Sequence, residues 1–372
     1  MQKEMTMAKL PAGPEWLTEY RKRNLAVFME RPVKKSKYTN ISALEEMLVQ
    51  GTAKMREPAI KFPNGAVKIL SVEEALEKMP GKIQEILSKE EKPKDQFDAF
   101  VNAYFDSGFV IIAKKDSSGT TLEIEIPEGV CAKYFIIAEK GADVGITERI
   151  ASSGNALVNQ TVYLEENSSL ALVRIHLEKS GMITHQQCIA ERDAKITNCN
   201  AWFGGSLVKA KTSNILEGNG SSAKECSLLL SDGAQHFDLG YTAIHRAEAT
   251  ESHCMFKSAL RGASRNVFDG MIRIEPTGAK TNALLECHSM ILGEKASSNQ
   301  IPGLEIKTDD VKATHSATVS RIDEDELFYL ESRGLPEQEA SKMVVKSFLE
   351  SVVYMLPETM RGAVLSEIEA RI

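Results

Sequence analysis

The sequence lacks any run of about eighteen apolar residues, the length that a helix needs to cross the hydrocarbon core of a membrane. Its first stretch, MQKEMTMAKLPAGPEW, lacks the apolar core of a signal peptide. Basic residues are not in excess, because the formal net charge is −7, whereas nucleic-acid-binding proteins carry a basic stripe. We therefore expect a cytoplasmic protein that binds neither membranes nor nucleic acids.

Motifs of catalysis and of common metal sites are also missing. The sequence contains no P-loop, no GxSxG and no HExxH, so we expect no enzyme, and any ATP hydrolysis would belong to a partner. It contains no CxxC pair, which argues against a zinc ribbon and a thioredoxin-like site. Four of the cysteines are expected to be small buried apolar residues: Cys131, Cys188, Cys199 and Cys226.

The first of three regions, residues 1–105, is expected to be mainly helical. Apolar periodicity predicts a helix over Glu15–Met29. Ser71, followed three residues later by Glu74, forms a capping-box pattern at the start of a helix over Val72–Met79.

Residues 106–320 show no helical periodicity and instead contain short apolar strands, such as Thr121–Ile126 and Leu157–Leu164. Clusters of Gly, Asn, Ser and Asp separate these strands at intervals of roughly 10 to 13 residues, which is typical of an all-β domain. Both a sandwich and a β-solenoid fit this pattern. About 200 residues is long for one sandwich, whereas a solenoid grows by stacking rungs, so we expect an imperfect β-solenoid.

Residues 321–372 return to a helical pattern. Asp323 is suited to cap a helix over Glu324–Ser332, Gly334 ends it, and Pro336 opens a longer amphipathic helix. We expect this helical region to shield the last rung of the solenoid, whose strands would otherwise form an open edge.

Cys287 and His315, two residues of types that bind soft metals, lie near the end of the β region. On the residues alone, both are more often core positions than ligands. His288, next to Cys287, points to the opposite face if both lie in one strand.

The segment DDVKATHSATVSRIDEDELFYLESRGLPEQEASKMVVKSFL resembles the SufB/SufD family of iron–sulfur cluster assembly scaffolds. The family shows a His before an Ala-Thr pair, an acidic turn, Leu-Phe-Tyr, an Arg-Gly turn and a helix entered through Glu-rich residues. Upstream, DGMIRIEPTGAKTNALLECHSMILG resembles the family's Gly-rich strand pair leading into a cysteine, and PEWL and KYTNIS resemble its N-terminal region. The resemblance covers both ends and much of the β region.

The resemblance implies a right-handed parallel β-helix between two helical regions. It also implies a homodimer or a dimer with a SufB or SufD paralogue, a SufC-type ABC ATPase, a sulfur donor protein and a transient iron–sulfur cluster at the dimer interface. Cys287 falls at the position of the SufB cysteine and His315 at the family histidine, so both are implied as cluster ligands. The residues implied to dock the ATPase, or to form the core beneath it, are Leu327, Phe328, Tyr329, Arg333, Gly334, Met343 and Phe348.

The sequence departs from the family pattern at three places. Ser316 stands where SufB usually has a Glu, Ala313 stands where SufD often has a Cys, and the stretch Val144–Ser153 lacks the cysteine that SufB is proposed to use for receiving sulfur. The SufB or SufD role therefore stays open. Two alternative functions also stay open: a β-helix enzyme acting on polysaccharide, which the missing signal peptide and the 6% aromatic content disfavour, and a purely structural interaction protein.

Overall fold

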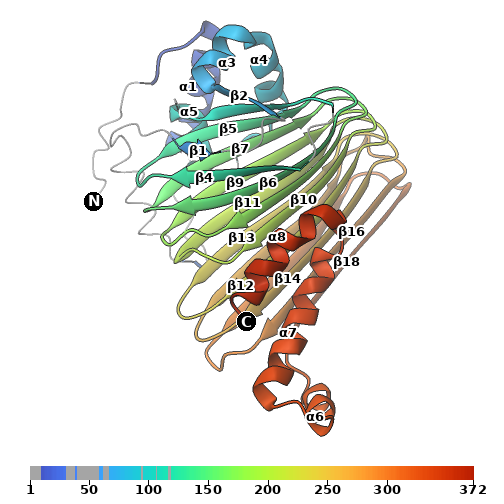
Figure 1. The fold of residues 1–372 in the computed structure, drawn as a ribbon. Coiled ribbons are helices and arrows are strands. Elements are labelled where there is room, and N and C mark those ends of the chain that lie inside the picture. The colour runs from blue at the N-terminus through green and yellow to red at the C-terminus, as the bar shows by residue number, and fades with distance from the viewer. Residues whose placement is uncertain are drawn as a thin grey trace.

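The computed structural model describes residues 10–30, 38–39, 58–61, 67–93, 95–105, 107–115 and 119–372. These residues form two facing sheets of mostly parallel strands, which make a β-solenoid with helices on its outer faces (Figure 1). The predicted mainly β fold and solenoid architecture are confirmed. The predicted Lys-Tyr-Thr-Asn-Ile-Ser motif lies largely outside the described residues.

Among the described residues each sheet has nine strands, and from β3 onward consecutive strands alternate between the two sheets. In spatial order, sheet A contains β1 (Ala59–Lys61), β4 (Thr120–Ile126), β6 (Asp143–Ser152), β8 (Ser169–His176), β10 (Lys195–Trp202), β12 (Ser222–Ser231), β14 (Glu251–Leu260), β16 (Thr281–Ile291) and β18 (Val311–Arg321). Sheet B contains β2 (Val67–Ser71), β3 (Phe109–Ala113), β5 (Cys131–Ala138), β7 (Ala156–Leu164), β9 (Met182–Ala190), β11 (Leu207–Leu216), β13 (His236–His245), β15 (Arg265–Ile274) and β17 (Ser297–Ile306).

The register shows how long one rung is. Lys195 of β10 lies opposite Ser169 of β8, and Val311 of β18 lies opposite Thr281 of β16, so the rungs lengthen toward the C-terminus. Each rung contributes one strand to each sheet, so a turn recurs twice in every rung. This explains why the turn clusters of the sequence are closely spaced while no simple repeat is visible.

Alternation along each strand decides what fills the space between the sheets. Val144, Leu170, Ile196 and Ala223 stand in register on four successive strands of sheet A and are all buried. They belong to one apolar cluster that fills the interior of the solenoid. Such in-register stacking buries the apolar face of every rung against its neighbours, which a single rung could not do alone.

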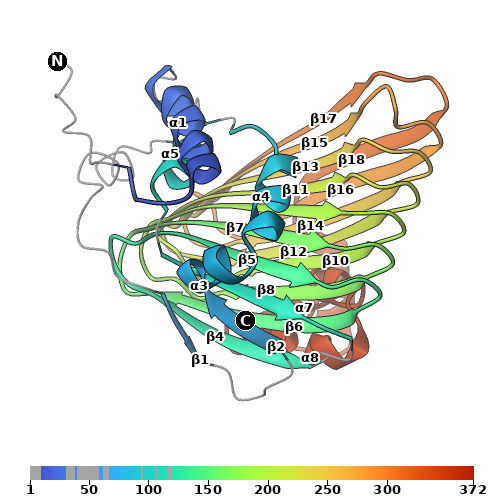
Figure 2. The same cartoon turned by 90° about the horizontal axis from the view of Figure 1, so that it is seen from above.

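The N-terminal helices cover the outer face of sheet B at its first rungs (Figure 2). They are α1 (Glu15–Glu30), α3 (Val72–Lys78), α4 (Pro80–Lys89) and α5 (Gln96–Tyr104). The predicted capping box is present, because the Ser71 hydroxyl accepts a hydrogen bond from the Glu74 amide and the Glu74 carboxylate accepts one from the Ser71 amide. Two strands, β1 and β2, also fall in this region, which we expected to be mainly helical, and both add antiparallel edges to the sheets.

The C-terminal helices α6 (Glu324–Ser332), α7 (Glu337–Val353) and α8 (Glu358–Glu369) occupy a different place from the one we expected. α7 packs across β12 and β14 on the outer face of sheet A, and α6 projects beyond the solenoid (Figure 1). The prediction that these helices shield the last rung is therefore wrong. The outer face of sheet A is itself apolar, with Val173, Cys199 and Leu228 buried there against Leu349, so the apolar stripe of α7 is used on that face.

Candidate functional site

Cys287 lies on β16 and faces the interior of the solenoid. Its side chain is fully buried within the interior apolar cluster, and its thiol donates a 3.4 Å hydrogen bond to the Ser316 carbonyl of β18. Burial raises the pKa of the Cys287 thiol to about 11. The thiol is therefore protonated at neutral pH and would have to lose its proton to act as a metal ligand.

His315 lies on β18, the edge strand of sheet A, and shares a face with Cys287. Cys287 stands opposite Ala317, and His315 precedes Ala317 by two residues, so all three point toward the interior. Strand spacing and rise place the Cα atoms of Cys287 and His315 about 8 Å apart on the diagonal. His315 is exposed, in contrast to the buried cysteine. The structure thus brings the two predicted residues together on the last two strands of sheet A.

The neighbouring histidines point away from this pair. His288 faces outward, where its Nδ1 lies 2.8 Å from the Thr318 hydroxyl. His253 also faces outward, and its Nε2 lies 3.0 Å from the Glu286 carboxylate. Within the described ranges, no three His, Cys, Asp or Glu side chains are grouped closely enough to hold a metal ion. Cys287 and His315 are therefore the two candidate ligands that the described residues place here.

The last rung leaves apolar side chains uncovered around this pair. Leu304 and Ile306 on β17 and Val319 on β18 are large apolar residues exposed to solvent. Leu304 stands in register with the buried Ile272, and Ile306 with the buried Ile274. These positions continue the interior columns of the solenoid to its end, where the described chain adds no further rung.

The residues implied to dock an ATPase separate into two groups. Phe328 and Tyr329 on α6 are 71% and 56% exposed, and Met343 on α7 is also exposed. The Arg333 guanidinium lies over the Tyr329 ring at 5.3 Å, and Gly334 ends α6 with a φ of 93°, which favours glycine. In contrast, Leu327 and Phe348 are partly buried against the cluster beneath α7. Phe328 and Tyr329 thus expose two aromatic side chains on α6, which projects beyond the solenoid (Figure 1).

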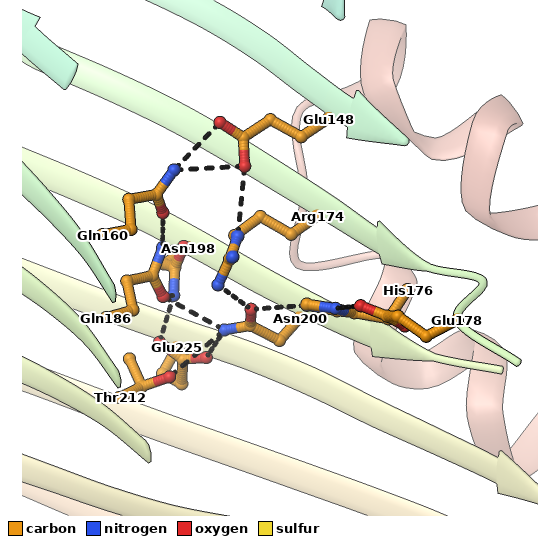
Figure 3. A network of polar contacts seen from close by, with 10 residues as sticks. All are labelled: Glu148, Gln160, Arg174, His176, Glu178, Gln186, Asn198, Asn200, Thr212 and Glu225. Carbon is orange, nitrogen blue, oxygen red and sulfur yellow. Dashed lines mark hydrogen bonds and ion pairs between the residues drawn. The ribbon is translucent and has the colours of Figure 1, made fainter. Parts of the chain in front are cut away.

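A buried polar network inside the solenoid was missed by the sequence analysis (Figure 3). The Arg174 guanidinium donates to Glu148 at 3.1 Å and to the Asn200 side chain at 3.2 Å. Glu148 also accepts from Gln160 at 2.9 Å. From Gln160 the network continues through Gln186 and Asn198 to Glu225. Asn200 also contacts Thr212, Glu225 and His176, and His176 pairs with Glu178 (Figure 3).

Burial shifts the charge states within this network. It raises the pKa of both Glu148 and Glu225, although Arg174 opposes the shift at Glu148 and neutral hydrogen-bond donors oppose it at Glu225. Burial also lowers the pKa of His176, whose ring stacks on Trp202 with centroids 3.5 Å apart. A cavity of about 20 Å³ beside Glu225 has room for one water molecule. The network is thus a buried polar layer within the otherwise apolar interior of the solenoid.

A signal for this network exists in the sequence. Glu148, Arg174 and Asn200 are each separated by the length of one rung, and so stack in register. A search for polar residues that recur at the rung length would have found the column, whereas strand-by-strand alternation did not.

The cysteines follow the expectation in most cases. Cys188, Cys199 and Cys226 are buried, as predicted, while Cys131 is only partly buried. Within the described ranges, no helix is both long and apolar enough to cross a membrane.

The fold and the site together define a parallel β-solenoid protein with helices on both faces and a thiol–imidazole pair at its open end. The family model described as "SUF system FeS cluster assembly, SufBD core domain" matches residues 120–348, which is more than half of the chain. The chain belongs to this family, as its resemblance predicted.

Several curated proteins are similar to the chain. An iron–sulfur cluster assembly SufBD family protein of Synechocystis is 27% identical over 320 residues, covering 80% of this chain and 66% of that protein. The iron–sulfur cluster assembly protein SufD of Bacillus subtilis is 30% identical over 248 residues, covering 64% of this chain and 56% of that protein. SufB of the same organism is 30% identical over 213 residues, covering 53% and 45%. The chain thus spans less than two thirds of the length of these relatives.

Proposed function

We propose that the protein is a scaffold of the SUF system on which a nascent iron–sulfur cluster is built at a dimer interface. The observation that carries this proposal is the position of Cys287 and His315 on one face of the last two strands of sheet A, at the uncovered end. Family membership supports a role in iron–sulfur cluster assembly. The cluster is the cargo of such a protein.

The ligand count favours two chains over one. Thiolate is the preferred ligand of iron–sulfur clusters, and imidazole can replace it on an iron. A [2Fe–2S] cluster needs four protein ligands, whereas one chain presents Cys287 and His315. A two-fold axis at the end of the solenoid would bring two of each together, with Cys287 of one copy near His315 of the other.

The uncovered end also suits pairing with a second copy or a paralogue. β18 and β17 are the edge strands of the two sheets, so each has unpaired backbone groups on one side. Leu304, Ile306 and Val319 would be buried by a partner's last rung, which makes association favourable. Sheet continuation across the dimer is the simplest arrangement that uses both features.

The exposed surface of α6 and α7, formed by Phe328, Tyr329, Arg333, Gly334 and Met343, is the proposed docking site for an ABC-type ATPase of the SufC kind. Large exposed aromatic and Met side chains on a projecting segment mark an interaction surface. ATP hydrolysis would then belong to that partner, and the scaffold itself would not be an enzyme. A sulfur donor protein would supply sulfide, and the proposed location of the assembly is the cytoplasm.

Anaerobic reconstitution tests the cluster site. Purified protein, co-expressed with its ATPase, is incubated with ferrous iron and sulfide, and iron and acid-labile sulfide per dimer are measured. Cys287→Ser and His315→Ala should each lose the cluster while circular dichroism stays unchanged, because an alcohol and a methyl group are poor ligands for iron. Cys226→Ala is the matched control, since Cys226 lies on the opposite face of sheet A beneath the C-terminal helices.

Normal cluster loading of Cys287→Ser would contradict the ligand assignment. If the wild-type chain binds the ATPase but loads no iron, the protein is a structural interaction protein instead.

Docking is tested separately by pull-down of the ATPase. Phe328→Ala with Tyr329→Ala should abolish binding, whereas Tyr354→Ala, an exposed aromatic at the other end of α7, should not. Retained binding by the double variant would place the docking site elsewhere.

A further inference from the structure

A pocket of about 320 Å³ lies on the outer face of sheet B and reaches from Asp98 of α5 to Glu305 of β17. α5 packs over β5, β7 and β9, and the pocket begins beside it over β11 and β13. Its floor is one in-register row: His185 on β9, Lys211 on β11, Gly240 on β13 and Asp269 on β15. Gly240 has no side chain, so the row has a hollow between Lys211 and Asp269.

The lysine, arginine and histidine side chains that line this hollow contact other described residues, with one exception. Lys209 pairs with Asp238 at 3.3 Å, and Arg273 pairs with Glu305 at 3.1 Å. The two nitrogens of His185 lie 3.0 Å from the Asp98 carboxylate and 3.1 Å from the Ser213 hydroxyl.

Lys211 is different. Its partly buried ammonium makes no ion pair within 4 Å and no hydrogen bond among the described residues. Burial lowers the pKa of Lys211, although the carboxylates of Asp98, Asp95 and Glu91 oppose this shift. An anionic group placed beside it would relieve the cost of burying this charge.

The total charge of the lining restricts which anion fits. Five carboxylates line the pocket, from Asp95, Asp98, Asp238, Asp269 and Glu305, against three side-chain cations. A simple anion would enter a region with an excess of negative charge, whereas a molecule that also carries a cation would be attracted by both signs. The volume corresponds to roughly ten water molecules, which suits a ligand of about ten non-hydrogen atoms.

We propose that this pocket binds a small zwitterion of the amino-acid class, with its carboxylate on Lys211 and its ammonium among the carboxylates of the lining. The molecule's side chain lies in the hollow over Gly240. The site is on the outer face of sheet B and does not depend on cluster assembly at the end of the solenoid.

Isothermal titration of the full-length protein with the twenty free L-amino acids tests the proposal. At least one should bind with a millimolar or lower Kd, and its amide and N-acetyl derivatives, which lack the carboxylate charge and the ammonium charge, should each bind at least ten-fold more weakly. Lys211→Met should weaken binding at least ten-fold. Lys195→Met, an exposed lysine on sheet A, is the charge-matched control and should bind normally.

A second variant tests the hollow without removing the charge. A Cβ atom at Gly240 would meet the Lys211 side chain at 3.5 Å, an ordinary contact, so Gly240→Val should fold and fill the space. It should abolish binding while Lys211 is still present. The proposal is overturned if no amino acid binds the wild type, or if binding survives both Lys211→Met and Gly240→Val.

Discussion

The ion pair between Lys133 and Glu90 offers a sharp test of how the N-terminal helices are held on the solenoid. Lys133 projects from the outer face of sheet B and is 1% exposed, and its Nζ lies 2.7 Å from the Glu90 carboxylate. Lys133 also donates to the Asn102 side chain at 2.8 Å, and the Tyr20 hydroxyl donates to Glu90 at 2.8 Å. The pair therefore links β5 to α1, α5 and the end of α4.

Removing one charge of this ion pair should lower the free energy of unfolding far more than removing both charges. Glu90→Gln keeps the shape and an acceptor for Tyr20 but removes the carboxylate that pairs with the buried Lys133 ammonium, which costs about 3–5 kcal/mol in comparable sites. Lys133→Met leaves the carboxylate buried without its cation and should cost a similar amount. The double variant contains neither charge and should recover most of the loss, with a coupling energy of at least about 2 kcal/mol.

Urea denaturation followed by tryptophan fluorescence measures these differences. Trp16 lies in α1, whereas Trp202 lies inside the solenoid, so a Trp202→Phe background reports on the N-terminal helices alone. Lys61→Met, which breaks an exposed pair with Glu125, is the control and should change stability by less than about 1 kcal/mol. A Glu90→Gln variant as stable as the control, or a double variant that loses the sum of both single losses, would refute the reasoning.

Two further predictions concern the solenoid and its C-terminal helices. Burial lowers the pKa of His245 to about 4, so the unfolded chain binds more protons than the folded one between about pH 4 and 6.5. The free energy of unfolding should therefore fall by about 3 kcal/mol on acidification across this window. Urea titrations at both pH values measure this loss, and an equal loss in His245→Gln would show that other groups cause it. Leu349→Ala should lower the free energy of unfolding by about 2–5 kcal/mol, because Leu349 is fully buried between α7 and sheet A. Limited proteolysis of this variant should release the C-terminal helices before the solenoid is cut. Ser347→Ala, at an exposed position of α7, should not change the rate of this cleavage.

Strand and helix positions could be predicted from the sequence because their signals are local. The helix predicted over Glu324–Ser332 has the observed bounds, since Asp323 caps it and Gly334 ends it within a short stretch of sequence. The strand predicted over Leu157–Leu164 matches β7 except at its first residue, because turn clusters flank it on both sides.

The position of the C-terminal helices could not be predicted in the same way. The apolar stripe on α7 indicates that this helix packs against another surface, but it does not identify that surface. The deciding fact is the apolar outer face of β8 to β14, and Val173, Cys199 and Leu228 contribute to it from three different rungs. The interior polar network also could not be predicted from local sequence, because the register of the stacked rungs brings Glu148 next to Arg174.

The candidate site combines a buried thiol with an exposed imidazole, and this difference in solvent exposure leads to a last prediction. The Cys287 thiol is covered by β18, on whose Ser316 carbonyl it makes a hydrogen bond. β18 is an edge strand paired on one side only, so it should open more readily than β14, which is paired on both sides. With a pKa of about 11, the thiolate fraction at pH 7 is on the order of 1 in 10⁴.

Iodoacetamide should therefore label Cys287 roughly two orders of magnitude more slowly than a free thiol at pH 7, and at the ordinary rate in urea. Hydrogen exchange should be faster in β18 than in β14, because β18 is paired on one side only. The proposed cluster site requires this movement, since it would uncover the thiol. If a second copy covers the open end, both labelling and exchange should slow as protein concentration rises. Labelling at the ordinary rate in the folded protein, independent of concentration, would mean that the thiol is open to solvent and that movement of β18 does not control the site.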